Sequence, residues 1–114
     1  MEIKRGDVVV CVVSGDYGKP RPAVVIQSDL YNPTHGSVTV LPVTTHLVKA
    51  PLLRVDLRPG KLNGLKEPSQ VMVDKVTALR RDRIRDPIGR LTKPQLEKVE
   101  SVLAAFLGFS TFVG

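Results

Sequence analysis

Arg21 stands between Pro20 and Pro22, just before a short aliphatic run, and its side chain is well suited to bind an anion. Each proline fixes its own φ at about −65° and favours extended backbone at the preceding residue, so Arg21 should lie in stiff backbone where a loop enters a strand. A guanidinium stays charged, and its fork of donors matches two phosphate oxygens. The stretch indicates a site for a phosphate or a carboxylate. A turn with an exposed arginine is the simpler alternative.

Two adjacent threonines are the next candidates. Thr44 and Thr45 follow Pro42, which cannot donate a hydrogen bond to a sheet and so marks an edge or a bulge near the end of a strand. Successive side chains of a strand point to opposite faces, so only one of the two hydroxyls should face Arg21. The alternative is that both threonines simply end the strand.

Asp74 offers a carboxylate. It ends a run in which Val71 and Val73 should face the core, which places Met72 and Asp74 on the other face. There the carboxylate could accept a proton or pair with Arg21, and a plain ion pair is the simpler of the two interpretations.

Other catalytic patterns are missing from the sequence. His35 and His46 lie far apart along the chain, and no cluster of cysteines or carboxylates at metal-ligand spacing accompanies them. Neither a glycine-rich phosphate loop nor a G-x-S-x-G turn is present. We therefore expect no metal and no cofactor.

The composition of the 114-residue chain, with 42% hydrophobic residues, is that of one folded domain over residues 1–114. No apolar run approaches the roughly 20 residues that cross a bilayer. Residues 1–7 lack the pattern of a secretion signal, so we expect a cytoplasmic protein without a membrane segment. Cys11, the single cysteine, lies in an apolar run and should be a buried thiol in a reducing compartment.

The net charge of +6 falls mostly between residues 75 and 90. This segment has two acidic side chains and six basic ones, the basic ones being Lys75, Arg80, Arg81, Arg83, Arg85 and Arg90. Such a stripe favours a polyanionic partner such as RNA, DNA or an acidic peptide. A solvated charged loop is the alternative.

The apolar pattern predicts a mainly β (α+β) domain. Short apolar runs separated by Gly, Pro and Asn predict strands over residues 8–13, 23–27, 37–44, 53–57 and 70–74, the last continuing with a kink to 79. Thr92 and Gln95 form a capping box before a helix that ends at Gly108. The apolar residues at helical spacing are Leu96, Val99, Leu103 and Phe106. We expect a strongly bent antiparallel sheet or small barrel closed by this helix.

Three stretches occur in a recognisable order: Lys-Arg-Gly-Asp at 4–7, Arg-Pro-Ala-Val-Val-Ile-Gln at 21–27 and Val-Leu-Pro-Val-Thr-Thr at 40–45. Residues 70–76 and the closing helix continue the pattern. Together they resemble the MazF/PemK (Kid) family of toxin endoribonucleases from bacterial toxin–antitoxin systems. The resemblance covers nearly the whole chain.

The resemblance implies a small SH3-like barrel with a C-terminal helix, a homodimer, and metal-independent, sequence-selective cleavage of single-stranded RNA. Arg21 matches the family's catalytic arginine and Thr44 its catalytic threonine. Asp74 matches a carboxylate proposed as general base in some members, and Asp16 lies where many members have an acidic residue that could serve instead. Contacts with RNA are expected from Asp16, Tyr17, Lys19, Thr45, His46, Arg80 and Arg81.

The 2′-hydroxyl of the RNA would be the nucleophile, and the products would be a 2′,3′-cyclic phosphate and a 5′-hydroxyl. The implied partner is a cognate antitoxin whose acidic tail covers Arg21. Two features depart from the family pattern: residues 14–20 form a shortened loop, and Met72 stands where some relatives have a second arginine.

Two other functions remain open on the sequence alone. A CcdB-type gyrase poison shares this fold, but such proteins carry a tryptophan at the end of the C-terminal helix and this chain has none. A barrel that binds RNA without cleaving it would stack bases on aromatic side chains, for which Tyr17 and Tyr31 are candidates in the two loops expected nearest Arg21.

Overall fold

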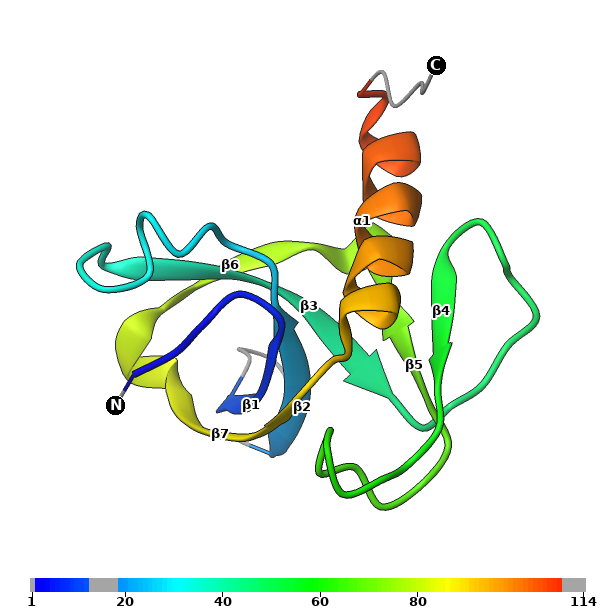
Figure 1. Ribbon diagram of the computed structural model, residues 1–114, viewed down its shortest axis with the longest axis horizontal. Helices are drawn as coiled ribbons and strands as arrows, with labels where there is room; N and C mark the ends of the chain where they lie inside the picture. Colours follow the sequence, from blue (N-terminus) through cyan, green and yellow to red (C-terminus); the bar gives the residue numbers. More distant parts are fainter. Residues whose placement is uncertain (1, 13–18, 110–114) are drawn as a thin grey trace.

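The computed structural model describes residues 2–12 and 19–109, which form an antiparallel sheet and one C-terminal helix (Figure 1). The strands are β1 (Asp7–Val12), β2 (Pro20–Val25), β3 (Ser37–Thr44), β4 (Arg54–Leu57), β5 (Ser69–Met72), β6 (Thr77–Arg80) and β7 (Ile84–Arg90). Two 3-10 turns, η1 (Val73–Lys75) and η2 (Arg81–Arg83), flank β6, and the helix is α1 (Lys93–Leu107). The expected mainly β class with a closing helix is confirmed, and the sheet stays open.

β3 is the strand that joins the two parts of the sheet, β4–β5 and β2–β1–β7. Its first half, residues 37–40, pairs with β6, and residues 43–44 pair with β5. On its other side, residues 40–42 pair with β2. β1 and β7 continue the sheet beyond β2, and β4 continues it beyond β5. In Figure 1 the strands from β6 through β3, β2 and β1 to β7 curl round like an open barrel.

The predicted kink after residue 74 is the turn η1, which separates β5 from β6 along β3.

β7, by contrast, is not predicted by the sequence. Its charged residues are exposed, and it contains Pro87 and Gly89, which are unusual inside strands. The β1–β7 register shifts on both sides of Val9, the residue opposite Pro87. Much of the basic stretch from 75 to 90 is therefore strand and turn, not a solvated loop.

The core has two parts, one on each face of β1. Val8 belongs to the part covered by α1, and Val9 belongs to the part inside the curl. This strand is thus buried on both faces. Cys11 is buried in the second part, as predicted.

α1 begins and ends as the sequence predicts. The Thr92 side chain accepts a hydrogen bond from the Gln95 N–H, and the Gln95 side chain accepts one from the Thr92 N–H. At the other end of the helix, Gly108 adopts φ 79°. Val99 and Val102 are its buried residues, whereas Phe106 is 46% exposed although its spacing suggested burial. Within the described part of the chain, no helix is long and apolar enough to cross a membrane.

Candidate active site

Arg21 lies where β2 has a partner strand on one side only. It pairs with Cys11 of β1, whereas pairing with β3 begins only at Ala23. Pro20 and Pro22 lack the N–H that a sheet ladder needs, so this part of β2 is poorly suited to pair with another strand on its open side. The Arg21 side chain is exposed, and its backbone is extended as predicted.

Thr44 ends β3, just after this strand changes partner. Pro42 pairs with Ala23 of β2, and two residues later Thr44 pairs with Gln70 of β5. The Thr44 Oγ1 atom accepts a hydrogen bond of 3.0 Å from the backbone N–H of His46. An oxygen that accepts this bond keeps its own hydrogen for another acceptor.

Arg21 and Thr44 line one hollow of about 270 Å³, which we call the Thr44 pocket. Its lining residues are Cys11, Arg21, Pro22, Pro42, Val43, Thr44, Met72 and Lys75. The polar groups at its surface include a guanidinium, a hydroxyl and an ammonium, set among proline, valine and methionine side chains. None of the lining residues is acidic, so the pocket suits an anion such as a phosphodiester.

A second hollow of about 280 Å³, the Thr45 pocket, is also lined by Arg21. It is lined by Val10, Pro20, Arg21, Pro22, Thr45, Gly64, Leu65, Lys66, Glu67, Ser69 and Ile88. Because Arg21 and Pro22 line both hollows, the two hollows are neighbours at the start of β2. The two threonines thus occupy different hollows that share Arg21.

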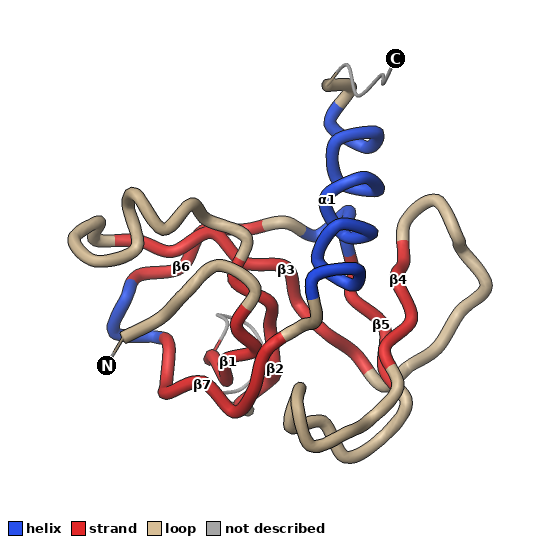
Figure 2. The backbone as a smooth tube through the Cα atoms, viewed as in Figure 1, coloured by secondary structure: helices blue, strands red, loops and turns tan. Residues whose placement is uncertain are grey.

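The wall of the Thr45 pocket is the segment between β4 and β5, drawn in tan at the bottom of Figure 2. Its backbone is pressed against β7. A Cβ on Gly64, at φ 72°, would come within 2.2 Å of the Ile88 carbonyl oxygen, and one on Gly89 within 2.3 Å of the Leu62 oxygen. Only glycine allows this approach, which fixes the wall of the pocket.

The structure does not bring Asp74 into either pocket lining. β5 ends at Met72 and the chain enters η1, so the alternation of a strand does not extend to residue 74. Lys75 lines the Thr44 pocket instead, and Glu67 is the one carboxylate in the lining of the Thr45 pocket. Glu67 was not singled out from the sequence, and Lys75 was named there only as part of the basic stretch from 75 to 90.

Three of the expected RNA contacts lie in described segments next to Arg21 and Thr44. Thr45 and His46 are exposed directly after Thr44, and Lys19 is exposed two residues before Arg21. Asp16 and Tyr17 lie outside the described residues.

Arg80 and Arg81 lie at the opposite end of β3. Arg80 pairs with Ser37, seven residues from Thr44, which is about 23 Å at 3.3 Å per residue. The Arg80 guanidinium contacts Asp82 at 2.7 Å. Arg81 donates to the carbonyl oxygens of Asn32 and His35, so it holds the loop at residues 28–36.

Tyr31 lies in that same loop, which follows β2 and not the stretch before Arg21. The expectation that it flanks Arg21 is wrong, because Arg21 stands at the beginning of β2 and the loop at its end. Its ring makes an edge contact with His35, at 6.3 Å between centroids. Among the residues that the structure describes, no group of three His, Cys, Asp or Glu side chains could hold a metal ion.

Residues 4–107 match the model of the PemK-like, MazF-like toxins of type II toxin–antitoxin systems. The chain belongs to this family. The match includes every residue that lines the two hollows beside Arg21. It does not favour the CcdB-type alternative or a barrel that only binds RNA.

Individual similar proteins support the same family assignment. A protein of Mycolicibacterium smegmatis named probable endoribonuclease MazF is 39% identical over 109 residues, covering 95% of this chain and 99% of the relative. A crystal structure of MazE–MazF from Deinococcus radiodurans has a TM-score of 0.78 at 28% identity and covers 96% of this chain and 99% of that one. A mycobacterial endoribonuclease in complex with its cognate antitoxin shares the fold, with a TM-score of 0.81 at 24% identity over 96% of this chain and 99% of that one.

Proposed function

We propose that this MazF-like endoribonuclease of a toxin–antitoxin system cleaves single-stranded RNA at a phosphodiester bound in the Thr44 pocket, without a metal ion. The observation that carries the proposal is that Arg21, Thr44 and Lys75 converge on one hollow while the neighbouring hollow shares Arg21. Two cations and a hydroxyl donor suit a phosphate group, and two hollows in series suit a chain of nucleotides.

The reaction uses a nucleophile that RNA itself carries. The 2′-oxygen attacks the phosphorus, the bond from phosphorus to the 5′-oxygen breaks, and the products are a 2′,3′-cyclic phosphate and a 5′-hydroxyl. Arg21 neutralises the charge that develops on the phosphorane, and Thr44 donates a hydrogen bond to a nonbridging oxygen. Donors aimed at developing charge are worth about 3–4 kcal/mol each in comparable sites.

The proton of the 2′-hydroxyl passes to a carboxylate, and we assign this role to Glu67. It is the acidic residue in the lining of the hollow beside Arg21, whereas Asp74 lies outside both linings. Lys75 can return a proton to the leaving 5′-oxygen, because an ammonium gives up its proton far more readily than a guanidinium.

Two partners follow from the same proposal. A homodimer would cover the apolar end of α1, where Phe106 is 46% and Phe109 65% exposed. An antitoxin with an acidic tail would compete with RNA for the cations around Arg21; the Deinococcus relative, 28% identical, is seen as MazE–MazF. We expect sequence-selective cleavage of messenger RNA in the cytoplasm.

The test is cleavage of a long single-stranded RNA in excess EDTA by the wild-type chain and by Arg21→Ala. Arg58→Ala is the matched control, since Arg58 is exposed and lines neither hollow. We expect discrete fragments with cyclic phosphate ends from the wild type and the control, and intact RNA with Arg21→Ala at equal thermal stability. Fragments with 3′-hydroxyl ends, or cleavage that EDTA abolishes, would contradict the mechanism.

A further inference from the structure

Gln70 is a buried side chain whose amide is fully hydrogen-bonded. It is 6% exposed. Its Oε1 accepts from the Val48 N–H at 3.1 Å and from Arg54 Nη1 at 2.9 Å, and its Nε2 donates to the Val48 oxygen at 2.9 Å and to Asp56 Oδ1 at 2.8 Å. These four bonds use both donors and both acceptors of the side chain. Gln70 therefore fixes the segment between β3 and β4 as a backbone partner would.

Arg54 connects this amide to the end of β3. Its Nη1 donates to Gln70 and also to the backbone oxygen of His46, at 3.2 Å. The N–H of that same residue, His46, donates to Thr44 Oγ1. In the ladder Thr44 pairs with Gln70, and Gln70 pairs with Asp56, so these side chains share one face of the sheet. We call Gln70, Arg54 and the His46 backbone the Thr44 relay.

We propose that the Thr44 relay is a positioning device for the Thr44 hydroxyl. This inference rests on the proposed function, in which Thr44 donates to a phosphate oxygen. Arg54 holds the His46 carbonyl, the His46 N–H then occupies a lone pair of Oγ1, and the hydroxyl hydrogen is left to point into the Thr44 pocket. A hydroxyl already turned toward its acceptor loses less entropy in the transition state. Gln70 and Arg54 act through Thr44 and touch no substrate.

Arg54→Met tests the relay, because it removes the guanidinium from a half-buried position and leaves the amide of Gln70 in place. The matched control is Lys98→Met. Lys98 lines the same hollow as Arg54, Asp56 and Gln70 but reaches it from α1. Both changes remove one positive charge from the lining of the same hollow. A general weakening of the electrostatic attraction for RNA should therefore appear in both variants alike.

We expect Arg54→Met to lower the single-turnover rate at saturating RNA about 10- to 100-fold, the scale expected when a catalytic group is displaced by a fraction of an ångström to an ångström. KM should stay near the wild-type value, and Arg54→Lys should recover part of the rate. In a Thr44→Val background, Arg54→Met should cause no further loss, since its effect passes through the hydroxyl. An effect on KM alone, or equal losses with and without Thr44, would overturn the inference.

Amide hydrogen exchange of His46 provides a second readout that does not depend on activity. Exchange of this N–H should quicken in Arg54→Met and in Gln70→Met and remain unchanged in Lys98→Met. A wild-type chain that leaves RNA intact would refute the proposed function, and the exchange data would still show whether the relay holds Thr44. Unchanged His46 exchange in Arg54→Met would overturn the relay itself, whatever the cleavage assay gives.

Discussion

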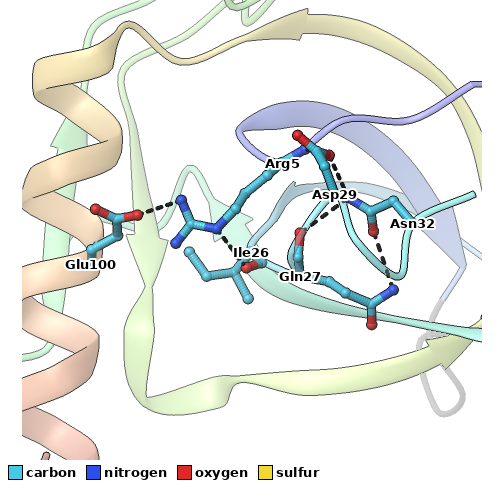
Figure 3. Close-up of polar contacts among 6 residues, drawn as sticks. All are labelled: Arg5, Ile26, Gln27, Asp29, Asn32 and Glu100. Atoms are coloured by element: carbon cyan, nitrogen blue, oxygen red, sulfur yellow. Dashed lines mark hydrogen bonds and ion pairs between the residues drawn. The ribbon is translucent and has the colours of Figure 1, made fainter.

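Arg5 and Glu100 form an ion pair that ties the N-terminal segment to α1, and Figure 3 shows the Arg5 guanidinium between the helix and the backbone after β2. Its Nε donates to the Ile26 oxygen at 3.1 Å, while its backbone N–H donates to Asp29 Oδ1 at 2.7 Å. One residue thus links the helix, the end of β2 and the loop at 28–36. Gly6 completes this turn with φ 92°, which favours glycine.

Replacing Arg5 should loosen this junction. Hydrogen bonds to charged groups contribute about 1.5–3 kcal/mol each, and the Arg5 side chain is 30% exposed, so we expect Arg5→Met to cost about 1–3 kcal/mol of unfolding free energy. Urea unfolding followed by circular dichroism measures it. Lys93→Met, an exposed change at the start of the same helix, should be close to neutral. An equal loss in both variants would contradict the assigned role.

The stability of the fold should fall in acid partly through Asp29. The Arg5 N–H, and next the Asn32 side chain, lower the pKa of this carboxyl below its ordinary value of 3.8. Because this pKa is lower in the folded state than in the unfolded chain, the ionised Asp29 carboxylate stabilises the fold above pH 3.8. This stabilisation is lost as the pH falls through the lower pKa of the folded state. Asp29→Asn should therefore be less stable than the wild type at neutral pH, and the difference should shrink in acid. Urea midpoints across an acid pH series would measure it, and a constant difference would refute it.

The two threonines should behave differently in the cleavage assay. Thr44→Val removes the hydroxyl to which we assign the phosphate contact, and we expect the single-turnover rate to fall about 10²- to 10³-fold, as for other lost donors of this kind. Thr45→Val removes a hydroxyl from the neighbouring hollow and should change KM more than the rate. Equal rate losses in both variants would show that the assignment to Thr44 is wrong.

Glu67 and Asp74 can be separated by the cleavage rates of their amide variants. If Glu67 takes the proton, Glu67→Gln should lower the single-turnover rate about 10²- to 10⁴-fold, the usual contribution of a general base. Asp74→Asn should leave the rate near the wild-type value. The reverse result would assign the base to Asp74 and remove Glu67 from the mechanism.

Arg81 should matter for stability and not for cleavage. Arg81→Met leaves the carbonyl oxygens of Asn32 and His35 without their charged donor, at a cost of about 1–3 kcal/mol. The cleavage rate of the folded fraction should equal that of the wild type. Arg83→Met, an exposed change two residues later, is the control for both measurements. A weaker affinity for RNA in Arg81→Met alone would restore Arg81 as an RNA contact.

The sequence predicts some elements of this fold much better than others. β3 has the expected bounds because a run rich in β-branched residues begins directly after the turn residue Gly36, and α1 because its capping box and its glycine stop are local signals. β7 could not be foreseen, since an edge strand with exposed charges lacks the apolar alternation that marks a strand.

In the candidate site, too, the sequence predicts the residues whose backbone is set by local signals and not those placed by tertiary packing. Arg21 and Thr44 occupy stretches whose backbone is set locally by proline and by strand pairing. Lys75 enters the pocket because a 3-10 turn breaks the alternation that would have presented Asp74. The place of Glu67 depends on the contact between β7 and the segment that joins β4 to β5, and that of Gln70 on the pairing of β5 with β3 and β4; spacing along the chain encodes neither.

β3 pairs with β2, β5 and β6, so the two halves of the active site depend on a single strand. Opening β3 would separate Arg21 from Thr44 and would also break most of the sheet. Its central amides should therefore exchange only on global unfolding, as the slowest in the chain. We therefore expect activity and native structure to be lost in one cooperative step, with no partly opened form that cleaves RNA at a reduced rate.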